Sequence, residues 1–184
     1  MTVWVARGME TSPSPKARDG GSLVLRRACD ADADAVAGIY NHEVVHGTGT
    51  LDEQPWDHAG ALAMMAEHDD RFPLWVACVG DAVVGFCSLS RVRHRCGYRF
   101  AAETSVYTAP EHQRKGIGRT MLEFLEMEAT RIGFHTVLSR ITGENSRSIA
   151  LFESCGHVRA GLEREVGFKF GRRIDVAIYQ KILG

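Results

Sequence analysis

The chain contains 184 residues, of which 45% are hydrophobic and 24% are charged. This length and composition predict one globular domain with a sizeable core, and they exclude an extensively disordered chain. The 22 Lys and Arg residues are balanced by 23 Asp and Glu residues, so the net charge of −1 excludes a uniformly basic surface for nucleic acid.

The N-terminal half begins with a segment that has no periodic pattern. Residues 1–22 are rich in Ser, Pro and Gly, which predicts a flexible extension, and residues 23–184 are expected to form the single domain. Alternating or helically spaced apolar residues then predict the following elements. They are a strand at 22–27, a helix from its cap Asp30 to about His46, a helix at about 57–70, and a hairpin of strands 74–79 and 83–89.

The C-terminal half contains the strongest amphipathic helix of the chain, at 118–132. Leu122, Leu125, Ala129 and Ile132 form its apolar stripe, which predicts that one face lies in the core. The other expected elements are a strand at 101–108 that ends before Pro110, a strand at 136–141, a helix at 146–154, and closing strands at 158–166 and 174–182. The order β-α-α-β-β-β-α-β-α-β-β predicts an α+β sheet protein.

The cysteines and the hydropathy pattern indicate the compartment. The five cysteines include no C-x-x-C pair, so neither a disulfide framework nor a thiolate zinc site is expected. We predict free, buried thiols and therefore a reducing compartment, the cytoplasm. No apolar run approaches the ~20 residues that span a bilayer, so no membrane partner is expected.

A basic loop that contains glycine connects a predicted strand to the strongest helix. The N-terminus of a helix presents unpaired N–H groups and the positive end of the helix dipole, both of which attract phosphate. Gly116 and Gly118 lack Cβ atoms, so an anion can approach the backbone, and Arg114, Lys115 and Arg119 supply positive charge. The loop is neither a Walker motif nor a G-x-G-x-x-G fingerprint, so ATP and NAD are not expected.

The sequence Gln113-Arg114-Lys115-Gly116-Ile117-Gly118 resembles the Q/R-x-x-G-x-G/A pyrophosphate loop of GCN5-related N-acetyltransferases, the GNAT superfamily. More narrowly, the chain is similar to the phosphinothricin/methionine sulfoximine N-acetyltransferase family. Besides the loop region at 110–118, the segments that carry this resemblance are 39–42, 102–107, 168–171 and 175–176. The resemblance implies the GNAT fold, a splayed, mostly antiparallel sheet flanked by helices. It also implies acetyl-CoA as co-substrate, no metal, and a homodimer.

The same resemblance implies which residues bind acetyl-CoA. Val106, Tyr107 and Thr108 would line the acyl-pantetheine arm, where backbone N–H groups would polarise the thioester carbonyl. Asn145 would meet the pantetheine, and Asn is also a favourable N-cap for the helix that follows it. The pyrophosphate would be bound by Gln113, Arg114, Lys115, Gly116, Ile117, Gly118, Arg119 and Thr120.

Glu103 is the residue that the resemblance assigns to catalysis. An amine attacks a thioester only when it is neutral, yet an α-amino group with a pKa near ~8 is mostly protonated at pH 7. A general base must remove that proton, directly or through water, and Glu103 matches the family's catalytic glutamate. The chain departs from the family pattern at Phe152. The family can carry a catalytic histidine at this position, and the wider superfamily a tyrosine that acts as general acid. A thiol with a pKa of about 8.5 can leave as the thiolate, so Phe152 does not exclude turnover.

Two arginines are matched to the substrate. By resemblance, Arg93 and Arg95 would face the acidic end of an amino-acid-like substrate, which a guanidinium binds through two hydrogen bonds. Tyr98 and Leu51 would wall the same pocket. A solvated basic loop is the alternative for both arginines. Structural roles are expected for four other residues. Lys169, Arg172 and Arg173 are expected to be charges at turns and at the sheet edge. His157, which is close to Phe152 in sequence, is also expected to be structural.

The sequence therefore predicts an acetyl-CoA-dependent N-acetyltransferase that acts on the α-amine of a small amino-acid-like compound, such as phosphinothricin or methionine sulfoximine. One alternative is a non-catalytic module that holds acyl-CoA. Another is a zinc hydrolase, because the segment from His42 to His46 has the pattern H-E-x-x-H, in which two histidines could share a metal. The acetyltransferase pattern accounts for this segment as well, and no metal is expected.

Overall fold

The computed structural model describes residues 22–184, so the extension predicted for residues 1–22 lies outside the described residues except for Ser22. The described part of the chain contains seven strands and four α-helices. The strands are β1 (Leu23–Arg27), β2 (Leu74–Val79), β3 (Ala82–Arg91), β4 (Ala101–Thr108), β5 (Thr136–Thr142), β6 (Val158–Lys169) and β7 (Arg172–Ile182). The helices are α1 (Ala33–His46), α2 (His58–Ala66), α3 (Ile117–Ile132) and α4 (Ser146–Ser154).

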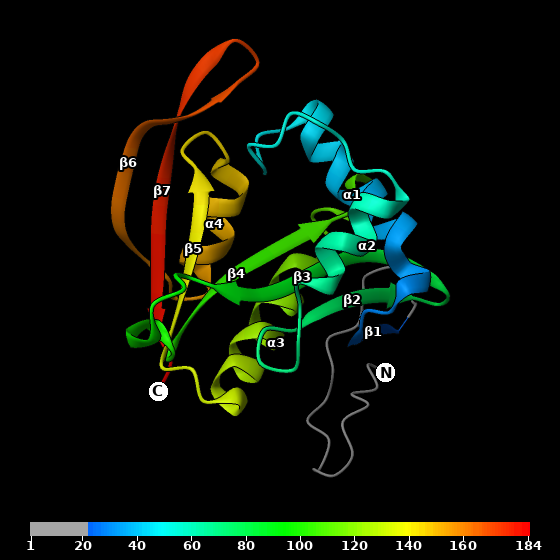
Figure 1. Ribbon diagram of the computed structural model, residues 1–184, viewed down its shortest axis with the longest axis horizontal. Coiled ribbons are helices and arrows are strands. Elements are labelled where there is room, and N and C mark those ends of the chain that lie inside the picture. The colour runs from blue at the N-terminus through cyan, green and yellow to red at the C-terminus, as the bar shows by residue number, and fades with distance from the viewer. Residues whose placement is uncertain (1–21) are drawn as a thin grey trace.

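The strands form one mixed sheet in the order β1-β2-β3-β4-β5-β7-β6 (Figure 1). All neighbouring pairs are antiparallel except β4 and β5, which run parallel. Parallel neighbours need a crossover connection, and α3 is the helix of that crossover. The N-terminus of α3 therefore follows the C-terminal end of β4 after a single loop. The predicted α+β fold, with its mostly antiparallel sheet, is confirmed.

Helices cover both faces of the sheet and bury one core on each (Figure 1). On one face, α3 packs Met121 and Leu125 against the strands. On the opposite face, α1 packs residues such as Val36 and Tyr40 against Val76 of β2 and its neighbours. The shorter α4 packs beside α3 over β5 and β7. The two cores hold the central strands in place from both sides.

Strands β4 and β5 separate after a short paired segment. They pair from Ala101 opposite Thr136 only as far as Glu103 opposite Leu138, although both strands continue beyond these residues. Just past this point, Oγ1 of Thr104 lies 2.5 Å from Oγ of Ser139 on β5, so side chains bridge the two strands where backbone pairing ends. The sheet is thus open between the C-terminal halves of β4 and β5.

The start of α1 differs from the prediction. A 3-10 turn follows Cys29, and α1 proper begins at Ala33 rather than directly after Asp30. The buried Asp32 explains the turn, because its carboxylate accepts the N–H of Cys29 at 2.9 Å and pairs with Arg26 at 2.7 Å. Hydrogen bonds from both groups lower the pKa of Asp32, those from Arg26 most, and burial opposes them.

Two other predicted ends differ by three residues or more. Helix α2 stops at Ala66 rather than near residue 70, because the carboxylate of Asp69 accepts the N–H of Phe72 at 2.7 Å and turns the chain toward β2. Strand β6 continues to Lys169 rather than ending at 166. It does so past Glu165, which has a φ of 52° and donates its N–H to the side chain of Asp175.

The cysteines are all free, but the prediction that they are buried is wrong for three of them. Cys78 and Cys87 are buried in the sheet, whereas Cys29 and Cys96 are exposed and Cys155 is partly exposed. The exposed pair lies at 3-10 turns, whereas Cys78 and Cys87 lie in stretches of β2 and β3 that are buried on both faces. Within residues 22–184, no helix is both long enough and apolar enough to cross a bilayer.

Candidate active site

Glu103 lies at the point where β4 and β5 separate. Its Oε2 accepts a hydrogen bond from Nη1 of Arg140 on β5 at 2.5 Å, and 22% of its side chain is exposed. Burial raises the pKa of Glu103, the charges of Arg140 and Arg93 oppose that rise, and the carboxylate of Glu163 adds to it. A carboxyl with a raised pKa at a cleft is suited to taking up a proton near neutral pH.

The backbone of β4 beyond Glu103 presents N–H groups to the open side. The N–H of Ala109 donates to the carbonyl of Val84 on β3. Because successive residues of a strand direct their N–H groups to opposite edges, those of Val106 and Thr108 point away from β3, toward the separated β5. Two N–H groups aligned in this way can stabilise negative charge on a carbonyl oxygen between the strands.

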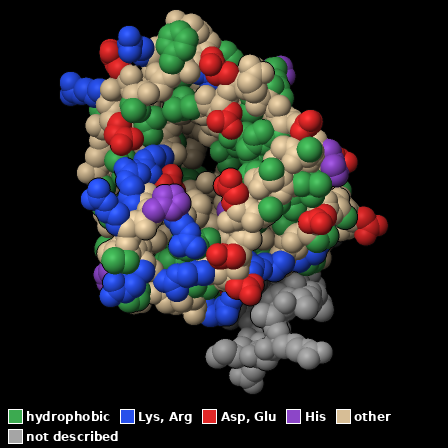
Figure 2. All heavy atoms as spheres, in the orientation of Figure 1, with side chains coloured by type: hydrophobic (Ala, Val, Ile, Leu, Met, Phe, Trp, Pro, Cys, Tyr) green, Lys and Arg blue, Asp and Glu red, His purple; other side chains and the backbone are tan. Residues whose placement is uncertain are grey.

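The space between these strands is visible on the molecular surface. Figure 2 shows the molecule hollowed near the centre of this face, between the separated ends of β4 and β5. Lys and Arg side chains gather on the left of the hollow in the same view. The border of the hollow thus carries basic side chains on its left and acidic side chains nearby, mostly on its other side.

The side chains of Val106 and Tyr107 point to opposite faces of the sheet. Val106 packs toward Phe152 and its neighbours under α4. Tyr107 lies in the core under α1, where its hydroxyl donates to the carbonyl of Gly49 at 3.2 Å and where burial raises its pKa. Of the groups predicted to meet the acyl arm, Tyr107 can thus contribute its backbone rather than its phenol.

The predicted phosphate loop turns sharply into α3. Arg114 and Gly116 have left-handed backbone conformations, with φ of 60° and 87°, and Gly116 is the N-cap of the helix. The first N–H groups of α3 lack intrahelical partners, as at every helix N-terminus. A Cβ at Gly118 would lie 3.3 Å from Cδ2 of Leu151 on α4 and 3.7 Å from Oγ1 of Thr108. Position 118 therefore leaves little room for a side chain beside β4.

Gln113 and Asn145 connect this loop to the start of α4. Gln113 donates to the carbonyl of Thr108 at 3.4 Å and accepts from Arg147 at 2.7 Å. The side chain of Asn145 accepts the N–H of Ser148 at 3.1 Å, which confirms its predicted role as an N-cap. The N-termini of α3 and α4 are thus joined at the mouth of the opening.

The remaining residues predicted for the pyrophosphate differ in orientation. Arg119 turns toward the C-terminal end of α4, where it donates to Oγ of Ser154 at 2.7 Å. Ile117 and Thr120 are buried against the rest of the fold, and both the N–H and the hydroxyl of Thr120 donate to the carbonyl of Gly116. Arg114 is exposed and Lys115 is half-buried. Arg114 and Lys115 are the cations that remain on the loop itself.

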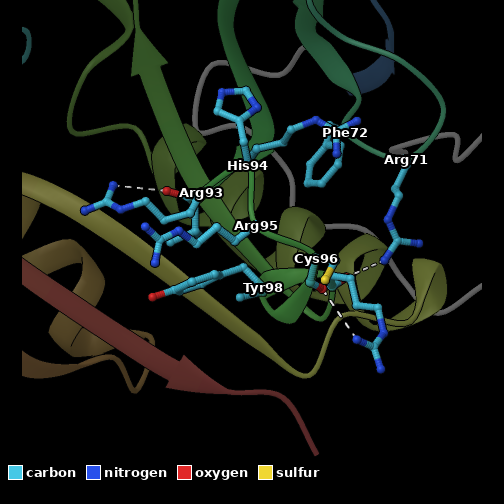
Figure 3. Close-up of a pocket in the computed structure, with 11 residues that line it drawn as sticks. Arg71, Phe72, Arg93, His94, Arg95, Cys96 and Tyr98 are labelled. Carbon is cyan, nitrogen blue, oxygen red and sulfur yellow. Dashed lines mark hydrogen bonds between the residues drawn. The ribbon is translucent and has the colours of Figure 1, made fainter.

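Three of the four residues predicted for the substrate lie together. Arg93, Arg95 and Tyr98 line a cavity of about 80 Å³ at the connection from β3 to β4. Figure 3 shows their side chains extending to the same side of this cavity, away from Arg71 on the other. The influence of Arg93 on the pKa of Glu103 shows that its charge is close to the opening. The connection thus brings the charge of Arg93 near Glu103.

Leu51 lies apart from the other three, against the outer hairpin of the sheet. A Cβ at Gly167 of β6 would lie 2.7 Å from Cδ1 of Leu51. The neighbouring Lys169, predicted as a turn or edge charge, is instead only 1% exposed. Its Nζ donates to the carbonyls of Glu43 at 2.8 Å and Thr50 at 2.9 Å, and burial lowers its pKa. Lys169 therefore holds the loop that carries Leu51.

The model of the acetyltransferase (GNAT) family matches residues 33–157 of the chain, which include Glu103, the loop and α4. The chain belongs to the GNAT acetyltransferase family. It is 35% identical over 159 residues to an L-methionine sulfoximine/L-methionine sulfone acetyltransferase of Salmonella typhimurium, covering 86% of this chain and 93% of that protein. It is 34% identical to a phosphinothricin N-acetyltransferase of Alcaligenes faecalis, covering 88% of this chain and 83% of that protein.

A solved structure agrees with the fold of this GNAT chain. A phosphinothricin acetyltransferase of Sinorhizobium meliloti, crystallised in complex with acetyl-CoA, superimposes with a TM-score of 0.83 at 36% identity. The match covers 88% of this chain and 89% of that one. The fold of this chain, in which β4 separates from β5 beside the start of α3, is therefore a GNAT fold.

Arg140 is the residue of this GNAT site that sequence reasoning missed. It lies inside β5 between the buried Ser139 and Ile141 and contacts Glu103 across the strands. A charged residue inside a strand that has no exposed position is the signal that could have found it, because such a residue needs a partner. Its partner could not be named without the parallel register of β4 and β5.

The position of Phe152 in this acetyltransferase is in the core. Phe152 is 3% exposed on α4, and its ring centroid lies 4.9 Å from that of His157. His157 is buried and its Nε2 lies 2.9 Å from a carboxylate oxygen of Glu126 on α3, as suits the structural role expected of it. Phe152 therefore provides packing at this position of α4.

The H-E-x-x-H segment lies on α1, as the sequence predicted, but no third metal-binding side chain joins it among residues 22–184. The rings of His42 and His46 have centroids 5.0 Å apart. The carboxylate of Glu43 accepts the N–H of Gly49 at 3.0 Å and so holds the loop after α1. Among residues 22–184, no group of three or more His, Cys, Asp or Glu side chains could hold a metal ion. Membership of the GNAT family replaces the zinc hydrolase interpretation.

Proposed function

We propose that the chain transfers the acetyl group of acetyl-CoA to the α-amino group of a small amino-acid-like substrate of the phosphinothricin or methionine sulfoximine type. The amine nitrogen forms a bond to the thioester carbonyl carbon, the C–S bond breaks, and coenzyme A leaves as its thiolate. Glu103 takes the proton that the amine loses, directly or through water. The observation that carries the proposal is the place of Glu103 where β4 separates from β5.

The residues around the opening fit acetyl-CoA, which supplies an activated thioester when bound. The loop and the N-terminus of α3 offer a pyrophosphate backbone N–H groups and the charges of Arg114 and Lys115. The N–H groups of Val106 and Thr108 are directed to stabilise the oxyanion that forms during attack. Solved relatives crystallised with acetyl-CoA support this arrangement.

The cations at the connection from β3 to β4 favour a substrate with an acidic group. Arg93 and Arg95 line one cavity with Tyr98. The charge of Arg93 also opposes the rise in the pKa of Glu103. A guanidinium pairs well with a carboxylate, phosphinate or sulfoximine oxygen while the amine of the same molecule meets the carboxylate of Glu103. The names of the related acetyltransferases support this substrate class.

The buried Phe152 raises a second candidate, a module that binds acyl-CoA without turnover. Phe152 can neither donate nor accept a proton, so this position cannot protonate the leaving sulfur. A thiol with a pKa of about 8.5 leaves readily as the thiolate, however, so the general base is the group that the reaction requires. Glu103 supplies it, and we therefore favour the enzyme.

A second copy of the chain and a cytoplasmic location complete the proposal. Strand β6 is an edge of the sheet. Its exposed apolar side chains, with one from the turn that follows, suit association with another chain. They are Val158, Leu162, Val166, Phe168 and Phe170. Light scattering should give twice the 20.3 kDa of one chain, and a single-chain mass would contradict the dimer.

The free thiols favour a location in the cytoplasm, and fractionation of cells tests this location.

The experiment that tests the function is a screen for release of free thiol from acetyl-CoA. Phosphinothricin and methionine sulfoximine should release thiol, and plain methionine, which lacks the second acidic or polar group, should release it more slowly. Calorimetry with acetyl-CoA is run in parallel. Binding without thiol release from any amine would identify the non-catalytic module, and absence of both would overturn the proposal.

A further inference from the structure

Arg140 lies between two carboxylates at the apex of the opening. Its Nη1 donates to Oε2 of Glu103 at 2.5 Å, and its Nε lies 3.7 Å from Oε2 of Glu163 on β6. The side chain of Arg140 is 24% exposed, that of Glu103 is 22% exposed and that of Glu163 is 39% exposed. One guanidinium is thus shared by an inner and an outer carboxylate, and solvent screens the inner pair less.

The titratable groups near Glu103 come from four parts of the chain. Arg140 belongs to β5, Glu163 to β6, Arg93 to the connection after β3, and Tyr107 to β4 itself. Tyr107 is half-buried and its pKa is raised, so it remains neutral at ordinary pH. Two cations therefore stabilise the ionised form of Glu103, and one carboxylate opposes it. Of these groups, Arg140 is the one bonded directly to Glu103.

We propose that Arg140, shared between Glu103 and Glu163, is the positioning residue that orients the base of the acetyl transfer and keeps it ionised. The proposal rests on the function assigned to Glu103 above. Arg140 does not need to touch the substrate, because it acts through the carboxylate that it holds. Glu163 competes for the same guanidinium and so limits how strongly Arg140 holds Glu103.

The physical consequence is an opposed pair of effects on the base. A general base works only when deprotonated, so the rate falls as the pH drops through the pKa of Glu103. Removal of Arg140 takes away a stabilising positive charge and raises that pKa. Removal of the charge of Glu163 takes away a destabilising negative charge and lowers it. A purely structural role for either residue would not produce shifts of opposite sign.

The test compares pH–rate profiles of Arg140→Gln and Glu163→Gln with the unchanged chain, using one amine throughout. Because the substrate amine contributes equally to every profile, differences between profiles report the enzyme. For Arg140→Gln, we expect the acidic limb to move to higher pH by about one unit, the low end of the effect of an adjacent Arg on a carboxyl. For Glu163→Gln, we expect a smaller move to lower pH.

Two control variants separate charge from packing. Arg140→Lys keeps a positive charge in β5 and should restore most of the unshifted limb. Arg159→Gln removes an exposed arginine of β6 that has no contact with Glu103 among the hydrogen bonds and ion pairs of residues 22–184, and it should leave the profile unchanged. If Arg159→Gln moved the limb as far as Arg140→Gln, general loss of charge would explain the effect and the proposal would be wrong.

A spectroscopic measurement covers the case in which Arg140→Gln abolishes turnover. Carbon-13 NMR of labelled glutamate side chains, in protein without ligands, reports the titration of Glu103, whose signal is identified by its loss in Glu103→Gln. We expect this titration to move to higher pH in Arg140→Gln. An unmoved titration together with an unmoved rate profile would overturn the role of Arg140. Full activity of Glu103→Gln would instead overturn the assignment of the base itself.

Discussion

Glu103 is the residue on which the chemistry depends. In Glu103→Gln the amide cannot accept a proton from the ammonium group of the substrate, while the shape of the side chain is kept. We expect kcat at pH 7 to fall by about 10²–10⁴-fold, the usual contribution of a positioned general base. Steady-state rates of thiol release measure it, with acetyl-CoA affinity as the control, which should not change. Undiminished turnover would show that another group removes the proton.

Residues whose roles depend on local sequence were predictable, and those with distant partners were not. Asn145 precedes a helix, and its capping bond to Ser148 joins residues three positions apart. Lys169, by contrast, binds carbonyls of Glu43 and Thr50, more than 100 positions away, so the sequence pattern at 168–171 could not show its burial. The same limit hid Arg140, whose contact requires the register of two strands that no local pattern specifies.

At the scale of elements, the strands and helices followed their apolar patterns, and the errors fell at their ends. A continuous apolar run located β2, which has a core on each face, and alternation located β1, which has its apolar face in one core. Ends depend on single side chains that bind backbone groups, such as Asp69 after α2 and Asp32 before α1. The loop after α1 is a further case, because it is held by Lys169 of β6.

The attachment of this loop to β6 gives an element-scale prediction. Lys169→Met removes the two hydrogen bonds that Nζ donates and leaves the carbonyls of Glu43 and Thr50 without this donor. The free energy of unfolding should therefore fall by about 2 kcal/mol. Urea unfolding measures this loss, and hydrogen exchange should become faster at residues 47–52. Arg173→Met, at an exposed position of the same hairpin, is the control and should change stability by less than about 0.5 kcal/mol. Equal stability of the two variants would mean that Lys169 does not hold the loop.

At the scale of the whole molecule, the topology of the sheet makes the site. Because β4 and β5 run parallel, the chain must cross over through α3 between them, and this places the start of α3 next to the open ends of the strands. The chain order of elements was predictable from the sequence, and the GNAT resemblance implied a splayed sheet. The residue at which the strands separate was visible only in the structure.

The binding of acetyl-CoA beside Gly118 is the central claim, and calorimetry on the unchanged chain and Gly118→Val tests it most directly. The valine would press on Leu151 and Thr108 and narrow the approach to the start of α3. Gly38→Val is the control, because a Cβ at Gly38 has no atom within 4 Å among the contacts that the structure describes. We expect the unchanged chain and Gly38→Val to bind equally, and Gly118→Val to bind about tenfold more weakly, or about 1.4 kcal/mol. No binding by the unchanged chain, or equal binding by a folded Gly118→Val, would contradict the account.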